Sequence, residues 1–430
     1  MHNNKFIHYS VVVIIVLLPA AGFASGFRIP EYSIAGMSLS NAVVANTEVK
    51  GAMTYNPAVM SMQEERRSAA IGFMNIMLDL HVRPENGVAT DSQGDDSVTV
   101  PNFYYMSKVS PNWAWGLGLQ APFGLETKWP AGTFQLFSAS PPLPAVIAGL
   151  EPETSKLEVA NLTPNVSYRL NENNSVSIGI NYYDVRKLIF NTQAIEINGS
   201  GDDFGYTLAY IYKRDAWSFG ATYRSEVKVT ANGSITAGGI TADASAEIEF
   251  PAMLQIGLRN QVNPQLAIEF DIERTYWSSF DVIEIHHQHP AQSAPPPNTI
   301  PSPITNTNNW TDVNAYRLAA TYQLANAWQL RFGYTFDETP QPDEYFSARI
   351  PDADRQLFSF GVSYKPNSWE FEAGIMYVKF DDRTINQPDN TFFGNVLSGN
   401  PEANGTDAYN GTYESSATII GIGFTKTFDE

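Results

Sequence analysis

The chain has 430 residues, no cysteine, few basic residues and, beyond its N-terminus, no long apolar run. Without cysteine there is no disulfide framework and no thiolate chemistry. Its 26 Lys and Arg stand against 45 Asp and Glu, a net charge of −19, so no basic surface for nucleic acid is supplied. A membrane-spanning helix needs about 20 apolar residues, which no later stretch provides. A disulfide scaffold, a nucleic-acid-binding protein and a helical membrane bundle are thereby excluded.

The N-terminus has the layout of a secretory signal. Lys5 precedes the apolar run 11–18, and residues 19–24 supply the small side chains of a cleavage site. Because that run is too short to span a membrane as a helix, we expect cleavage after Ala24 rather than a retained anchor. An exported chain without disulfides suits a bacterial envelope.

Apolar and aromatic side chains alternate with small or polar ones in many segments. In residues 328–337, for example, Trp328 and Phe332 share one face of a strand while Arg331 and Thr335 share the other. Charges on a lipid-facing surface cost on the order of a few kcal/mol, so the polar face looks into a lumen or into protein. The fourteen expected strands are 68–80, 98–109, 113–124, 156–170, 174–186, 203–213, 216–230, 247–261, 265–276, 314–324, 328–337, 355–365, 368–380 and 416–428.

A soluble β-sandwich also has one wet face, but three features favour a membrane barrel. They are the export signal, the even number of strands, and the aromatic content of 21 Tyr, 25 Phe and 8 Trp. Short turns alternate with long connections, as periplasmic turns and extracellular loops do in outer-membrane barrels. The expected long connections are 81–97, 125–155, 187–202, 231–246, 277–313, 338–354 and 381–415.

Residues 25–67 do not alternate, and we expect a compact element there with short helical turns. The chain is thus divided into a signal peptide at 1–24, this element at 25–67, and a barrel at 68–430.

Several segments resemble the FadL-type outer-membrane transporters of long-chain fatty acids and other hydrophobic compounds. The resemblance runs from about residue 25 to the end and is carried by 25–33, 56–58, 114–118 with 123–125, 222–228, 314–318 and 350–355. It implies an all-β fold, a 14-stranded antiparallel transmembrane barrel whose lumen is plugged by residues 25–67 as a hatch. It also implies passive uptake without a cofactor, through an internal apolar pocket, hatch movement and a sideways exit where the third strand kinks inward.

The third strand supplies a candidate for that kink. It ends with Pro122, Phe123 and Gly124. Proline cannot donate to a strand ladder, and glycine marks a bend or bulge. One interpretation is a lateral gate, and the other is a strand that simply ends at Pro122.

Two sets of residues in the expected hatch are candidates for the transport path. Phe27 and Ile29 either line the pocket or pack the hatch core. Asn56, Pro57 and Ala58 either form an ordinary turn or helix start, or a family motif with a structural or gating role.

Three arginines are candidates for contact with a ligand. Arg224 and Arg317 share the lumen parity of their strands, so they either anchor the hatch through ion pairs or hold a substrate carboxylate. Within the resemblance, Arg186 aligns with a position associated with the ligand head group. Its side chain has the parity of the apolar positions of its strand, however, so it faces the lumen only if the strand bulges. Near Arg317 the family has a lysine where this chain has Val313, which favours a neutral or aromatic ligand.

The loop after the third strand is apolar and contains Phe134, Leu136 and Phe137. An exposed patch of this kind predicts hydrophobic docking, and the alternative is a loop folded onto the barrel rim. No acid cluster lies near the histidines at 286, 287 and 289, so we expect no metal site.

We therefore expect a monomeric bacterial outer-membrane transporter, without enzymatic activity, that takes up a long-chain fatty acid or another hydrophobic small molecule. Outer-membrane lipid, lipopolysaccharide and the assembly machinery of the outer membrane are its expected partners. A general diffusion porin is the main alternative. A lipid hydrolase that uses His81 is a weaker one, because no nucleophile–base arrangement stands out.

Overall fold

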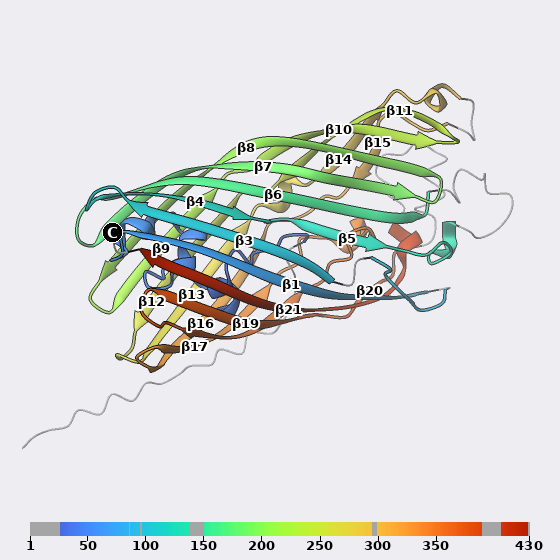
Figure 1. The fold of residues 1–430 in the computed structure, drawn as a ribbon. Coiled ribbons are helices and arrows are strands. Elements are labelled where there is room, and N and C mark those ends of the chain that lie inside the picture. The colour runs from blue at the N-terminus through green and yellow to red at the C-terminus, as the bar shows by residue number, and fades with distance from the viewer. Residues whose placement is uncertain are drawn as a thin grey trace, which may run out of the picture.

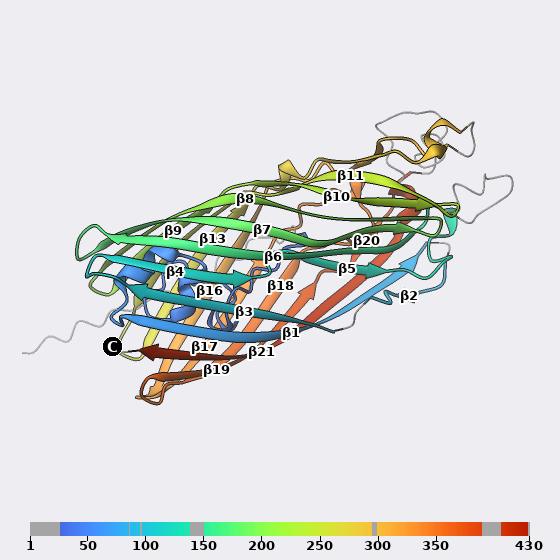
Figure 2. The same cartoon turned by 45° about the horizontal axis from the view of Figure 1, so that its top comes forward.

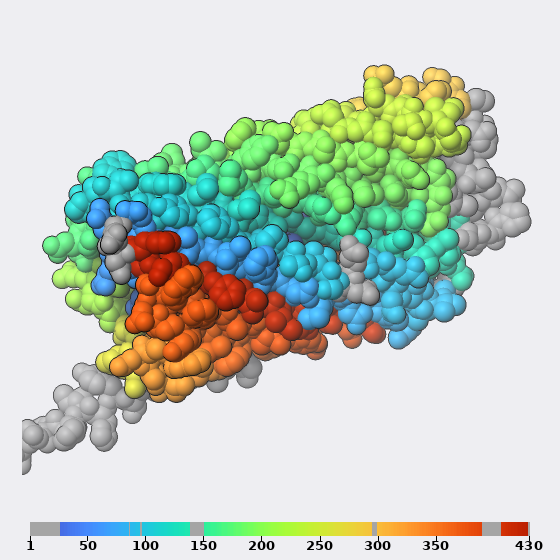
Figure 3. Space-filling model, viewed as in Figure 1, coloured from blue at the N-terminus to red at the C-terminus, as the bar shows by residue number. Residues whose placement is uncertain are grey.

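Fourteen antiparallel strands close into a barrel in this computed structural model, which describes residues 26–85, 87–94, 97–137, 150–294, 299–388 and 406–428 (Figure 1). The expected signal peptide lies outside these residues. The first and last strands pair antiparallel from Arg67 opposite Phe428 to Pro84 opposite Gly411, which closes the wall. Figure 3 shows these two strands side by side on the outer surface, in blue and red. The expected all-β barrel of fourteen strands is confirmed.

Several barrel strands are interrupted, so that two labelled elements make one strand. The strands in order are β1 (Arg67–Pro84), β3 (Ser97–Lys108), β4 (Trp113–Gln120) with β5 (Gly124–Lys128), β6 (Pro152–Arg169), β7 (Asn174–Thr192), β8 (Ile195–Arg214), β9 (Trp217–Arg224) with β10 (Val227–Ala237), β11 (Ile240–Phe250) with β12 (Met253–Gln261), β13 (Leu266–Thr275) with β14 (Val282–His287), β15 (Ile304–Thr307) with β16 (Val313–Ala325), β17 (Trp328–Asp337), β18 (Arg355–Tyr364), β19 (Trp369–Phe380) with β20 (Arg383–Ile385), and β21 (Gly411–Phe428). The short β2 (Thr90–Asp91) pairs with the end of β1.

The outer wall carries an apolar belt that follows from the alternation in the sequence. In β17, Phe332 is 45% exposed, whereas Arg331 is fully buried on the lumen side. Four strands begin with an outward tryptophan directly after a short turn, and these side chains are between 44% and 52% exposed: Trp113, Trp217, Trp328 and Trp369. Aromatic rows of this kind mark the membrane interface of outer-membrane barrels. Among the described residues no helix is both long and apolar enough to cross a membrane.

The prediction of two long loops is wrong. Residues 187–202 and 231–246 largely continue as strands, because β7 runs to Thr192 and β10 runs to Ala237. The hairpin between β10 and β11 turns at two glycines with positive φ, Gly238 and Gly239. Beyond the apolar belt the outward positions are polar, so hydrophobic alternation reports only the part of each strand that faces lipid. Figure 2 shows β10 and β11 projecting at the end opposite the C-terminus.

The non-alternating N-terminal segment lies inside the barrel, at the end where the C-terminus lies (Figure 1). It contains α1 (Ile34–Ser38) and two 3₁₀ helices, η1 (Lys50–Thr54) and η2 (Pro57–Met62), as expected. Ser33 caps α1 by accepting a hydrogen bond from the Gly36 N–H at 3.0 Å. Further 3₁₀ turns lie in the barrel connections: η3 (Gln135–Phe137), η4 (Trp277–Ser279), η5 (Pro290–Ser293), η6 (Asp343–Tyr345) and η7 (Thr406–Tyr409).

The hatch packs against small residues of the barrel wall. Leu39, Val43 and Val59 belong to one buried cluster with Ala209 and Ala319 of the wall. Two wall glycines let the hatch backbone approach closely. A Cβ on Gly220 would stand 2.0 Å from the Val44 carbonyl oxygen, and one on Gly333 would stand 2.3 Å from the Leu39 carbonyl carbon. Side chains at these two positions would therefore displace the hatch.

Replacement of Gly220 by alanine is expected to push the hatch off β9 while leaving the lipid-facing belt intact. Overpacking of this kind costs about 1–3 kcal/mol. Gly220→Ala should therefore raise ion conductance in planar bilayers and lower the unfolding temperature. Gly199→Ala is the matched control, because the nearest atom to its added Cβ is 3.4 Å away. Equal conductance of the two variants would contradict a hatch seated by close backbone contact.

Candidate functional site

The third strand of the barrel is broken at the predicted place. β4 ends at Gln120 and β5 begins at Gly124, and both segments pair with β6. β4 also pairs with β3, but this pairing stops at Phe103 opposite Leu119. No pairing joins β5 to the first part of β3 in the described chain. The wall therefore has a gap in its hydrogen-bonded ladder between these two segments.

Backbone of the hatch occupies the break from the lumen side. The Ile29 N–H donates to the Pro122 carbonyl oxygen at 2.9 Å, and the Gly124 N–H donates to the Phe27 carbonyl oxygen at 3.1 Å. Arg28 and Phe123 form an isolated antiparallel bridge between these bonds. The N-terminal segment thus acts as a short strand that satisfies the backbone of the break.

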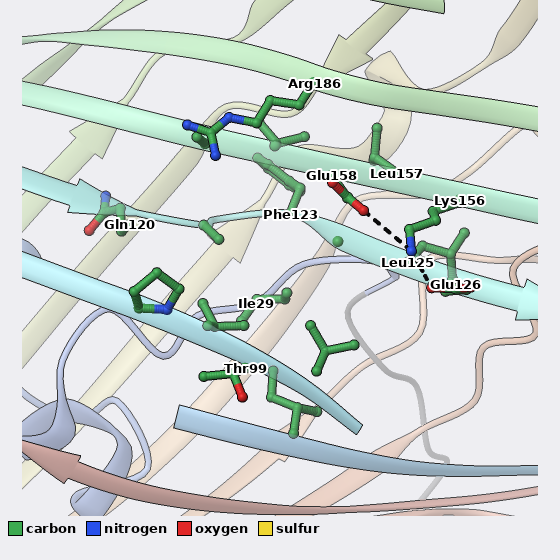
Figure 4. Close-up of a pocket in the computed structure, with 18 of the residues that line it drawn as sticks. Ile29, Thr99, Gln120, Phe123, Leu125, Glu126, Lys156, Leu157, Glu158 and Arg186 are labelled. Carbon is green, nitrogen blue, oxygen red and sulfur yellow. Dashed lines mark hydrogen bonds and ion pairs between the residues drawn. The ribbon is translucent and has the colours of Figure 1, made fainter. Parts of the chain in front are cut away.

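A cavity of about 370 Å³ lies in the wall at the break (Figure 4). Aliphatic side chains from β1, β3, β4, β5 and β6 line most of it, including Ile76, Val98, Val100, Leu119 and Leu157. Charged side chains lie along one part of its lining. The Lys156 ammonium contacts Glu126 at 2.7 Å and Glu158 at 3.3 Å, so its charge is matched there. The cavity therefore offers an apolar surface through the wall.

Two inner cavities adjoin the first. One of about 150 Å³ shares residues of β1 and β5 and Ile29 with the wall cavity, and hatch residues, residues 350–352, β18, β19 and β21 complete its lining. This lining includes the charged side chains of Arg28, Glu31, Asp352 and Arg355. Another, of about 60 Å³, shares Leu157 with the wall cavity. Leu125 lines all three. Side-chain movement at Leu125 or Ile29 would therefore join neighbouring cavities into one path.

Phe27 and Ile29 both reach these cavities. Phe27 lines the two inner ones, but it is also the centre of an aromatic cluster, with ring centroids 4.8 Å from Trp277 and 5.2 Å from Phe280. Ile29 lines the wall cavity and the larger inner one. Both interpretations of Phe27, pocket lining and hatch packing, therefore describe its surroundings.

Arg224 and Arg317 contact the hatch network instead of the cavities. The Arg224 Nη2 donates to the Thr54 carbonyl oxygen at 2.5 Å. The Arg317 Nη2 donates to Glu273 Oε1 at 2.9 Å, and Glu273 also binds Arg28 of the hatch, whose Nη2 is 2.8 Å from Oε2. Neither Arg224 nor Arg317 lines the three cavities. The contacts of both favour the anchoring role over recognition of a head group. The sequence did not predict the ion pair of Arg28 with Glu273, because two residues that meet across the lumen leave no pattern of neighbouring residues in the chain.

β7 has a bulge beside Arg186, and a bulge is what the strand alternation required for this side chain to face the lumen. The pairing of β7 with β8 shifts register between Val185 and Leu188. The side chain is nevertheless 63% exposed, ion-paired with Asp184 at 3.1 Å, and stands among the residues that line the wall cavity. It is thus placed beside the wall opening and outside the inner cavities.

Asn56 joins the hatch to itself and to the wall. Its Oδ1 accepts from the Ala58 N–H at 3.1 Å, which caps η2 with Pro57 in the first turn. Its Nδ2 donates to the carbonyl oxygens of Val44 at 2.7 Å and Tyr210 at 2.9 Å. The helix-start interpretation thus describes the local geometry, and the bond to β8 adds an anchor.

The described part of the apolar loop after the third strand packs inward. Phe134 and Phe137 are buried and belong to a rim cluster with Trp129 and Phe346, against which Leu136 packs partly buried. These three residues therefore correspond to a loop folded onto the rim rather than to an exposed patch. Residues 138–149 of this loop lie outside the described residues.

The histidines contact local partners. The His287 Nε2 lies 2.8 Å from the Pro301 carbonyl oxygen. The His289 Nε2 lies 3.1 Å from the Ala237 carbonyl oxygen. His81 Nδ1 lies 2.5 Å from Asp91 on the β1–β2 hairpin.

Known proteins share this architecture. The profile of the family described as outer membrane protein transport protein (OMPP1/FadL/TodX) matches residues 15–428, and the chain belongs to this family. The family and the barrel place the chain in the bacterial outer membrane.

Individual relatives are distant but match over most of their length. The chain is 22% identical to the long-chain fatty acid transport protein of Escherichia coli over 90% of this chain and 94% of that protein. It is also 22% identical to outer membrane protein P1 of Haemophilus influenzae, over 87% and 90%.

Two solved structures share the fold. A Pseudomonas aeruginosa FadL homologue superposes with a TM-score of 0.75 at 15% identity, covering 94% of this chain and 100% of that one. The Ralstonia pickettii toluene transporter TbuX gives 0.67 at 17% identity, covering 92% and 98%.

Removal of the carboxylate shared by Arg28 and Arg317 is expected to destabilise the hatch. Glu273→Gln leaves two buried guanidinium groups without a negative partner, which costs about 3–5 kcal/mol. The free energy of unfolding in guanidinium and the protease sensitivity of residues 26–66 are the readouts. Glu284→Gln, at a half-exposed carboxylate, should change stability by no more than about 0.5 kcal/mol. Matching unfolding curves for the two variants would refute the anchoring role.

Proposed function

We propose that this chain carries hydrophobic small molecules, long-chain fatty acids or other hydrophobic compounds, passively across the outer membrane. The ligand occupies the inner apolar cavities and leaves sideways through the wall at the break between β4 and β5. The observation that carries this proposal is the wall cavity at the break, which shares lining residues with both inner cavities. Names of relatives add support, since one is a long-chain fatty acid transport protein and another a toluene transporter.

The physical advantage of this route is that aliphatic side chains accompany the ligand from the inner cavities to the wall opening. Burial of apolar surface contributes about 25 cal/mol per Å², so a path lined by Leu125 and Leu157 keeps the ligand stable until it reaches lipid. No energy source is needed, because the ligand moves toward the membrane interior down its own gradient. A sideways exit also avoids the hatch residues that lie inside the barrel at the end where the C-terminus lies (Figure 1).

Hatch movement is the gating step in this proposal. Residues 27–29 are held to the break by two backbone hydrogen bonds, and the ion pair of Arg28 with Glu273 holds them to β13. Displacement of Ile29 would join the wall cavity to the larger inner one, because its side chain lines both. A general diffusion porin would instead need an open polar lumen, which the buried hatch does not favour.

A size series at Gly124 tests the exit. A Cβ there would lie 2.9 Å from Ile29 Cδ1, the mobile end of a flexible side chain, so Gly124→Ala should transport normally. Gly124→Leu and Gly124→Phe should fill the opening and lower uptake progressively, by about tenfold or more for phenylalanine. Uptake of labelled fatty acid and of labelled toluene would be measured in cells that lack their own transporter, with equal surface levels of folded barrel. Uptake by the phenylalanine variant at the wild-type rate would sink the proposed exit.

A further inference from the structure

Two buried arginines, Arg224 and Arg349, make no ion pair with a described residue, and of the two Arg349 alone lines one of the three cavities. Arg349, in the connection between β17 and β18, is only 6% exposed and makes no ion pair with any described residue. Three other buried arginines of the lumen are ion-paired: Arg317 with Glu273, Arg331 with Glu370 and Glu372, and Arg355 with Asp337. Arg224 instead donates to a carbonyl oxygen of the hatch. A charge buried without a partner is costly, which makes Arg349 a candidate functional group.

The contacts of Arg349 hold it in place without neutralising it. Its Nη1 donates to Ser155 Oγ at 3.0 Å and to the Asn191 carbonyl oxygen at 2.9 Å. Its guanidinium carbon lies 3.7 Å from the centroid of the Phe190 ring. Burial lowers the pKa of Arg349 to about 10, so the group stays cationic at neutral pH. A fixed positive charge is thereby presented in apolar surroundings.

This charge lines the smallest of the three cavities. The remaining walls of that cavity are largely apolar, with Leu125, Leu157 and Phe190 among them. Asn308 also lines it, and its Nδ2 is buried without a hydrogen-bond partner. A water occupies roughly 30 Å³ in the liquid, so the cavity volume of about 60 Å³ suits a small polar group. Two buried donors in a cavity with many apolar lining residues fit an anion that carries an apolar tail.

We propose that Arg349 and Asn308 receive the carboxylate of an amphiphilic ligand, whose tail passes Leu125 into the two larger cavities. This inference rests on the proposed function and names its ligand class, a fatty acid rather than a neutral aromatic hydrocarbon. The cavities allow this arrangement, because the small one shares Leu125 and Leu157 with the wall cavity and Phe27 with the larger inner one. Lys156 does not compete for the head group, because its two carboxylate partners occupy it.

A matched pair of ligands tests the head-group site. Purified barrel in detergent is titrated with a long-chain fatty acid and with the primary alcohol of equal chain length, both radiolabelled. Wild type should bind the acid more tightly. Arg349→Met should weaken binding of the acid by at least about tenfold, since hydrogen bonds to charged groups are the strong ones. The same variant should change binding of the alcohol by no more than about twofold.

Control variants separate charge from folding. Arg83→Met removes an exposed arginine, 61% accessible, on β1 and should leave both affinities unchanged. Asn308→Leu should weaken binding of the acid by a smaller factor than Arg349→Met does. If Arg349→Met does not yield a heat-modifiable folded barrel, Arg349→Gln is used, and it should show the same selective loss.

The outcomes distinguish the two proposals. Equal binding of acid and alcohol by wild type, or equal loss of both in Arg349→Met, would overturn the head-group site and leave hydrophobic uptake standing. Failure of wild type to bind either ligand or toluene would overturn the proposed function itself. Selective loss of acid binding in Arg349→Met supports both the head-group site and the proposed function.

Discussion

A wall that spans a membrane has to satisfy its own backbone N–H and C=O groups, because lipid offers no hydrogen-bond partner. The break at Pro122 violates this requirement, since the ladder between β3 and β5 is interrupted there. Hatch residues Phe27 and Ile29 restore it with two backbone hydrogen bonds. The opening in the wall and the position of the hatch are therefore one structural feature. The cavities are arranged around this contact, and movement of the hatch would change the wall at the same time.

Buried charge organises the remainder of the lumen. Glu273 holds Arg28 of the hatch and Arg317 of the wall, and Asp271 and Glu269 accept the Val44 and Ala45 N–H groups at 3.1 Å and 2.7 Å. Such pairs contribute little net stability but make loss of one partner expensive, so they specify where the hatch sits. Arg349 departs from this arrangement. It makes no ion pair with a described residue and lines the smallest of the three cavities, where an external anion would supply the missing partner.

Sequence reasoning predicted the architecture well and the extent of its strands less well. Fourteen segments with two-residue periodicity were enough to predict the barrel, because lipid imposes hydrophobicity on every second residue. The same signal ends at the membrane boundary. Residues 187–202 and 231–246 were therefore expected to be loops, although the ladder of backbone hydrogen bonds continues through much of both. The position of the break was predictable from Pro122 and Gly124, whose backbone chemistry is local.

The sequence by itself thus determined the membrane barrel, the non-alternating N-terminal segment and the site of the break. Each of these depends on local periodicity or on backbone restrictions of single residues. Only the tertiary structure decided which of three buried arginines bind the hatch or an acidic partner and which one lines a cavity. Arg224, Arg317 and Arg349 cannot be told apart by their neighbours in the chain, because their partners come from strands and hatch residues far away in sequence. Which charged side chains meet across a closed lumen depends on how the strands are placed in space. A cavity likewise exists only where side chains from several strands leave space between them.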